Sequence, residues 1–98
     1  MGCFIDKHPA RALPTLEGNA NVKDILTGHY KRRDDAINKC MKAAKKLNFN
    51  VFAIQDGGQC FSSANAKVAG LKYGKSSNCD KKSGKGGPMA NAVYEILN

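Results

Sequence analysis

The 98-residue chain has no tryptophan, no long apolar segment and no cysteine pair in C-x-x-C spacing. Its longest apolar run, Val51 to Ile54, is far shorter than the about 20 residues of a membrane-spanning helix. Structural zinc sites usually take two ligands from one tight turn, and no such turn is present. No G-x-S-x-G sequence and no Asn-x-Ser/Thr sequon occur. These absences argue against a membrane-spanning protein, a zinc-stabilised domain, a serine hydrolase and N-glycosylation.

The four cysteines of the chain are dispersed over most of its length, at Cys3, Cys40, Cys60 and Cys79. An even number of dispersed cysteines in a short chain is typical of a disulfide framework formed in an oxidising compartment. We therefore expect a secreted or extracellular protein in its mature form. Free or metal-bound thiols are the alternative, and spacing alone leaves three disulfide connectivities open.

The chain is strongly basic, with 16 Lys and Arg against 8 Asp and Glu and a formal net charge of +8. Such a surface attracts polyanions over a Debye length. Disulfides argue against an intracellular nucleic-acid partner, so we expect no nucleic acid and favour extracellular polyanions such as acidic or sulfated glycans. The alternative is that the charge serves solubility alone.

Catalytic signals are weak throughout the sequence. The segment ending in Gly74-Lys75-Ser76 nearly matches a phosphate-binding loop, but Ala69 stands where the first glycine is needed. His8 and His29 are isolated in sequence, and no set of nucleophile, base and orienting residue is visible. We therefore expect no enzyme activity, no cofactor and no metal ligands.

The order of the expected elements predicts an α+β fold, with one helix packed on a small antiparallel sheet in a single domain of residues 1–98. Aromatic and β-branched runs predict the strands, and steps of three and four predict the helix. The expected strands are Gly2 to Asp6, Phe49 to Gln55, Gln59 to Ser62 and Ala92 to Ile96. The expected helices are Asp34 to Leu47 and a short one within Ser63 to Leu71.

The main helix has two distinct faces in sequence. We expect its apolar positions to be buried against the sheet and its lysines to be exposed on the opposite side. The expected buried residues are Ile37, Cys40, Ala44 and Leu47, and the expected exposed residues are Lys39, Lys42 and Lys46. Asn48 is expected to end the helix.

Several sequence segments together resemble WSC domains, which are extracellular modules related to the PAN/apple fold. Gly2-Cys3-Phe4-Ile5-Asp6 followed by Arg11-Ala12-Leu13 is similar to the opening G-C-Y-x-D…R-x-L of that family. The resemblance continues through Cys40, through Asn48 to Gln55, and through Gly57-Gly58-Gln59-Cys60-Phe61-Ser62, which is similar to the turn G-x-x-C-x-C-G. Asn78-Cys79 and Val93-Tyr94 also match, so the resemblance covers nearly the whole chain.

The cysteine count departs from the family pattern of eight. The four cysteines match the first, second, fourth and sixth of the family, and Ala44 and Ser62 stand at the third and fifth, which normally pair. The seventh and eighth, another pair, are absent. Loss of complete pairs leaves no stray thiol, and the resemblance implies Cys3–Cys79 and Cys40–Cys60 in a reduced, four-cysteine variant.

The resemblance implies a carbohydrate-binding, lectin-like module, and the basic surface favours acidic glycans. The absence of tryptophan removes a common sugar-stacking residue. The alternative is a structural or protein-interaction module of an extracellular matrix or cell-surface assembly. The candidate ligand-binding residues are polar loop side chains and aromatic rings: Gln55, Asp56, Gln59, Ser62, Ser63, Tyr73, Asn78 and Asn91, with Tyr30 and Phe61 as further stacking candidates.

Overall fold

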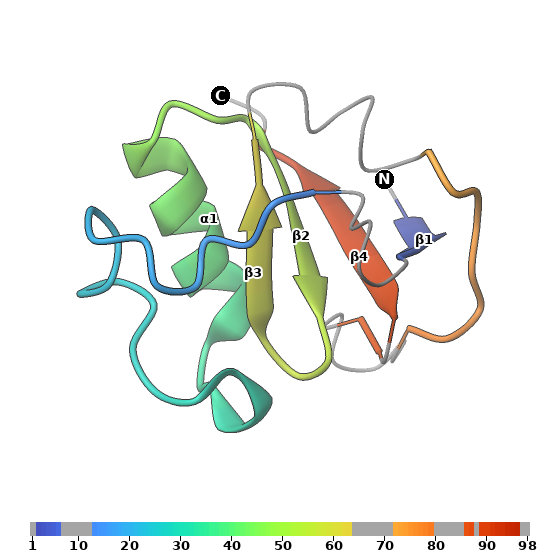
Figure 1. Ribbon diagram of the computed structural model, residues 1–98, viewed down its shortest axis with the longest axis horizontal. Helices are drawn as coiled ribbons and strands as arrows, with labels where there is room; N and C mark the ends of the chain where they lie inside the picture. Colours follow the sequence, from blue (N-terminus) through green and yellow to red (C-terminus); the bar gives the residue numbers. More distant parts are fainter. Residues whose placement is uncertain (1, 7–12, 64–71, 80–85, 88, 97–98) are drawn as a thin grey trace.

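A computed structural model describes residues 2–6, 13–63, 72–79, 86–87 and 89–96 of the chain. It contains a four-stranded antiparallel sheet with one α-helix packed against it (Figure 1). The expected α+β architecture is therefore confirmed. The strands are β1 (Gly2–Ile5), β2 (Val51–Gln55), β3 (Gln59–Ser62) and β4 (Ala90–Glu95), in the spatial order β1-β4-β2-β3. The short helix expected within Ser63 to Leu71 lies outside the described residues, apart from Ser63.

Both faces of the sheet are buried, although a single covering helix predicts one buried and one solvated face. Successive strand residues point to opposite faces. Phe52 and Ile54 of β2 therefore face the helix, while Val51 and Ala53 join a second apolar cluster on the other face. All five residues of β2 are buried, and the strand lies between β4 and β3 near the centre of the sheet. This double burial explains the continuous apolar run in the sequence. The second cluster is Phe4, Leu13, Val51, Ala53, Phe61 and Val93.

The helix α1 (Ala36–Lys46) starts two residues later than expected, because Asp35 adopts a left-handed conformation with φ 53°. Asn48 ends it as expected, with φ 63°. The N–H of Asn48 donates to the carbonyl of Lys45 at 3.0 Å, and the N–H of Phe49 donates to that of Ala44 at 2.9 Å. These two bonds form a Schellman motif, which satisfies carbonyls at the helix end.

The buried face of α1 differs in detail from the expected one. Cys40 and Ala44 are buried as expected, together with Ala36 and Ala43. Ile37 and Leu47 pack against the same core but remain partly exposed. On the opposite face Lys42 and Lys46 are exposed, whereas Lys39 is only partly exposed.

The core on the helix face also takes side chains from the long segment that precedes the helix. Leu16, Val22 and Leu26 are buried against α1 and the sheet. Phe52 stacks on Tyr94 with ring centroids 5.3 Å apart. Burial of Tyr94 raises the pKa of its phenol above the usual value, since desolvation disfavours the ionised form.

The two outer strands of the sheet are each partly covered by an irregular segment. Beside β3, the N–H of Leu16 donates to Cys60 O at 2.8 Å, and the N–H of Ser62 donates to Pro14 O at 3.2 Å. Beside β1, the N–H of Ile5 donates to Gly74 O at 2.8 Å, and that of Ser76 to Cys3 O at 3.0 Å. Several outward-facing backbone N–H and C=O groups of the two edge strands therefore already have hydrogen-bond partners.

Two disulfides join distant parts of the chain, in the pairing that the resemblance implies. Cys40 of α1 is bonded to Cys60 of β3, and both residues are fully buried. Cys3 of β1 is bonded to Cys79, and both remain partly exposed. One bridge fixes the helix to the sheet, and the other fixes β1 to the segment that follows Lys72.

Candidate functional site

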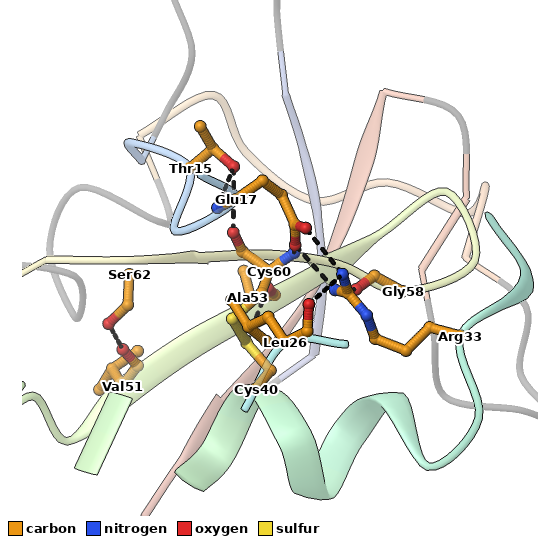
Figure 2. Close-up of a disulfide and its surroundings, with 10 residues drawn as sticks. All are labelled: Thr15, Glu17, Leu26, Arg33, Cys40, Val51, Ala53, Gly58, Cys60 and Ser62. Atoms are coloured by element: carbon orange, nitrogen blue, oxygen red, sulfur yellow. Dashed lines mark hydrogen bonds and ion pairs between the residues drawn. A yellow bond between two sulfur atoms is a disulfide. The ribbon is translucent and has the colours of Figure 1, made fainter. Parts of the chain in front are cut away.

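A buried arginine organises the segment that precedes the helix. The side chain of Arg33 is only 1% exposed, and it forms two hydrogen bonds of 2.8 Å to the two carboxylate oxygens of Glu17 (Figure 2). The remaining donors reach main-chain carbonyls, which are Leu26 O, Thr27 O, Gly28 O and Gly58 O at 2.8–3.3 Å. All three guanidinium nitrogens are therefore hydrogen-bonded, as the burial of a charge requires.

Glu17 connects this cluster to strand β3. Its Oε2 also accepts a hydrogen bond from the N–H of Cys60 at 2.8 Å. Thr15 reinforces the connection, because its Oγ1 accepts from the N–H of Glu17 at 3.0 Å and donates to Cys60 O at 3.3 Å. The buried ion pair thus fixes residues 26–33 against the hairpin formed by β2 and β3.

The turn of this hairpin, Asp56-Gly57-Gly58, contacts the backbone of the 3-10 helix η1 (Tyr30–Arg32) directly. A Cβ atom at Gly57 would lie 2.9 Å from Lys31 O, and one at Gly58 would lie 2.7 Å from Tyr30 O. Both distances are shorter than real Cβ contacts. Glycine at these two positions therefore allows η1 to lie against the turn.

On the surface of this fixed segment lies an open hollow of about 340 Å³, lined by His29, Lys31 and Arg32. His29 caps η1, with its Nδ1 accepting a hydrogen bond from the N–H of Lys31 at 3.2 Å. The imidazole ring also stacks on Tyr30, with centroids 4.8 Å apart. A ring nitrogen that accepts a hydrogen bond carries no proton, so the proton of the neutral ring is on Nε2.

The polar groups of the three described lining residues are hydrogen-bond donors, although most of the surface that lines the hollow is apolar. Lysine and arginine have donors only, and the remaining nitrogen of His29 is an N–H donor. Lys31 has one acidic partner, since its Nζ lies 3.9 Å from Oδ2 of Asp56. Among the described residues Arg32 forms no ion pair and is exposed. Such a site favours a ligand that supplies acceptors or a negative charge.

A second polar cluster is buried at one end of the opposite sheet face. Gln55 Nε2 donates to Oδ2 of Asp6 at 2.7 Å and to Oδ1 of Asn91 at 2.9 Å. The three residues are 2%, 3% and 0% exposed. The three residues lie together because side chains alternate between the two faces of a sheet along each strand. Gln55 shares its face with Val51, Asp6 with Phe4, and Asn91 with Val93, and these apolar partners belong to the second cluster. Within the described part of the chain, the buried Nδ2 of Asn91 has no hydrogen-bond partner.

The structure separates the candidate ligand-binding residues into buried and accessible groups. Gln55, Ser62 and Asn91 are buried, and Ser62 Oγ donates to Val51 O at 2.5 Å, so these side chains serve internal hydrogen bonds. Phe61 is 1% exposed and packs in the second apolar cluster, where it cannot stack on a surface ligand.

The accessible candidates lie in different places. Asp56 lies beside the hollow because it pairs with Lys31, and Tyr30 lies beside it because its ring stacks on His29. Gln59 begins β3 directly after the hairpin turn and is partly exposed, as is Ser63, which follows the last residue of that strand. Tyr73 has the ammonium of Lys72 5.1 Å from its ring centroid, and Asn78 is exposed, with its N–H bonded to Ser76 Oγ.

Sequence reasoning did not single out Lys31, Arg32 or Arg33. The run Lys31-Arg32-Arg33 was a usable signal for a basic site, but it does not distinguish the buried Arg33 from its exposed neighbours. That distinction depends on Glu17 and Gly58, which are distant in sequence.

Within the described residues, no group of three or more His, Cys, Asp or Glu side chains is placed to hold a metal ion. No helix in that part of the structure is long and apolar enough to cross a membrane. Comparison of the chain with protein-family models, with curated proteins and with solved structures gives no match.

Proposed function

We propose that the protein is an extracellular carbohydrate-binding module that binds acidic glycans at the hollow formed by His29, Lys31 and Arg32. The observation that carries the proposal is that the described residues lining the hollow are His29, Lys31 and Arg32, two of which are cationic and carry donors only. Acidic glycans supply the complementary groups, since their carboxylates and hydroxyls accept hydrogen bonds.

The rigidity of the segment supports a binding role. Arg33 and the glycine turn fix the backbone of η1, so a ligand meets donors on a main chain that is already ordered. The stacked rings of His29 and Tyr30 add a flat surface beside the donors, against which the apolar face of a sugar ring packs.

The overall charge contributes attraction rather than selectivity. A net charge of +8 concentrates any anion near the surface, and this term weakens as salt rises. The two disulfides in so small a domain fit an extracellular location, where acidic glycans are abundant ligands.

The experiment measures binding of uronic-acid oligosaccharides and their neutral counterparts by titration calorimetry at two salt concentrations. Arg32→Ala removes the lining cation that has no ion pair with any described residue, and we expect acidic-glycan affinity to fall about fivefold. Lys42→Ala is the matched control, since it removes one exposed positive charge from α1 without touching the hollow. We expect that control to change affinity less than twofold.

Equal losses in both variants would contradict the proposal, because they would show attraction to the whole basic surface rather than a site. Absence of all glycan binding would also contradict it. In either case a structural or protein-interaction module becomes the better account.

A further inference from the structure

We propose that Asp56 is a specificity-determining residue, which limits the hollow to sugars with a single acidic group and disfavours densely sulfated chains. The inference rests on the proposed glycan-binding function and narrows its ligand class. Its basis is the number of positive charges in the hollow that are left without a protein partner.

Of the two cations among the described lining residues, one lacks an acidic partner within the described part of the chain. Lys31 Nζ lies 3.9 Å from Asp56 Oδ2, which partly offsets its charge, since solvent reaches both side chains. Arg32 forms no ion pair with any described residue. One guanidinium matches one carboxylate, with which it forms a planar, two-point contact. The described residues therefore offer one cation without an acidic partner, which favours a ligand with one anionic group.

Other acidic residues near the hollow oppose a second anionic group. Asp34 and Asp35 are exposed and follow Arg32 and Arg33 directly in sequence. Consecutive Cα atoms are about 3.8 Å apart, so the Cα atoms of Asp34 and Asp35 lie within about 12 Å of that of Arg32, a distance comparable to a Debye length. Oδ1 of Asp35 accepts a hydrogen bond from Nδ2 of Asn38 at 2.9 Å. A ligand with several sulfates per disaccharide would place negative charge beside Asp56 and these residues. The net positive charge of the protein draws such chains to other surfaces, such as the exposed lysines of α1.

The position of Asp56 is fixed rather than incidental. It lies in the hairpin turn with φ 49°, and the following glycines pack against η1. Aspartate and asparagine both tolerate this left-handed conformation. Asp56→Asn therefore removes the charge without straining the turn, and a failure to fold is not expected.

The test compares two ligands, an oligosaccharide with one terminal uronic acid and a highly sulfated heparin oligosaccharide of equal length. In the wild type we expect the mono-acidic ligand to bind through Arg32, while heparin binding depends little on Arg32. Asp56→Asn should raise heparin affinity about two- to fivefold, the upper part of the range for an exposed ion pair. It should change affinity for the mono-acidic ligand less than twofold. Asp24→Asn, which removes one exposed charge from a separate loop, controls for net charge.

Two results would overturn the inference. The first is that Asp56→Asn and Asp24→Asn change heparin affinity equally. The second is that the wild type binds heparin more tightly than the mono-acidic ligand and loses that heparin binding in Arg32→Ala. Both results are compatible with a loss of mono-acidic binding in Arg32→Ala, so measuring that variant in parallel distinguishes them from failure of the proposed function. That failure would appear instead as equal losses in Arg32→Ala and Lys42→Ala, or as no glycan binding at all.

Discussion

Each side of the sheet contains one disulfide and one buried polar cluster, but the two sides differ in how deeply the disulfide is buried and how fully the cluster is hydrogen-bonded. The β3 side contains Cys40–Cys60 and the ion pair of Arg33 with Glu17. The β1 side contains Cys3–Cys79 and the cluster of Asp6, Gln55 and Asn91.

The difference lies in burial and in hydrogen bonding. On the β3 side both cysteines are fully buried and every nitrogen of the Arg33 guanidinium donates a hydrogen bond. On the β1 side the cysteines are partly exposed, and the buried amide nitrogen of Asn91 lacks a partner among the described residues. A fully satisfied buried network holds one geometry, whereas an incomplete one carries a desolvation cost. The hollow lies on the side with the complete network, where a rigid backbone is needed.

The largest expected effect comes from the disulfides. Replacing Cys3 and Cys79 by serine removes a cross-link between residues 76 apart, and the chain-entropy model gives a loss of about 4.5 kcal/mol. Replacing Cys40 and Cys60 by alanine removes one between residues 20 apart, for which the same model gives about 3 kcal/mol. Urea unfolding of both double variants measures which disulfide contributes more to the free energy of unfolding. A larger loss for Cys40–Cys60 would show that burial, rather than loop length, dominates.

The next effect concerns the ion pair on the β3 side. Arg33→Met keeps much of the side-chain volume but leaves Glu17 and several carbonyls without their donor. We expect a loss of about 3 kcal/mol, the lower end for a broken buried pair, because the Glu17 side chain is 23% exposed. Arg32→Met is the matched control, since it removes the same charge from an exposed neighbour and should cost less than about 0.5 kcal/mol. Similar unfolding midpoints for the two variants would contradict the organising role of Arg33.

The smallest effect is expected in the polar cluster on the β1 side. Gln55→Met is close in shape and removes the donor to Asp6 and Asn91, so we expect a loss of about 2 kcal/mol. Gln59→Met, in the partly exposed first position of β3, serves as the control and should be nearly neutral.

Asn91→Leu sharpens the comparison within the same cluster. It removes one acceptor of Gln55 but also the buried nitrogen that lacks a described partner, so the two changes offset each other. We expect unfolding free energy to remain within about 1 kcal/mol of the wild type. A loss as large as that of Gln55→Met would show that the Asn91 amide is fully satisfied in solution.

The fold was predictable because its signals are local. Periodicity in sequence identified α1, and the run from Val51 to Ile54 identified the central strand. Boundaries shifted where the backbone turns, as at Asp35, whose left-handed conformation delays the start of the helix. The cover over the second sheet face was not predictable from one amphipathic helix, and it explains why Gln55 and Asn91 are buried rather than exposed.

The site was less predictable because it depends on contacts between distant residues. Tyr30 and Asp56 were identified as polar or aromatic side chains in loops, and both lie beside the hollow. The hollow itself depends on Arg33, whose partner Glu17 and acceptor Gly58 lie 16 and 25 residues away. No local pattern in the sequence indicates which arginine of a basic run turns inward.

The covered edges of the sheet have a consequence for assembly. An open edge strand accepts another chain by strand addition, the usual route to β-rich aggregates and to peptide capture. Here residues 14–16 occupy part of the outer edge of β3, and residues 74–76 occupy part of that of β1. Neighbouring molecules at high concentration therefore meet through side chains rather than through backbone pairing. We expect reduction of the partly exposed Cys3–Cys79 bridge to weaken the hold of residues 74–76 on β1 and to favour pairing of two molecules through that edge.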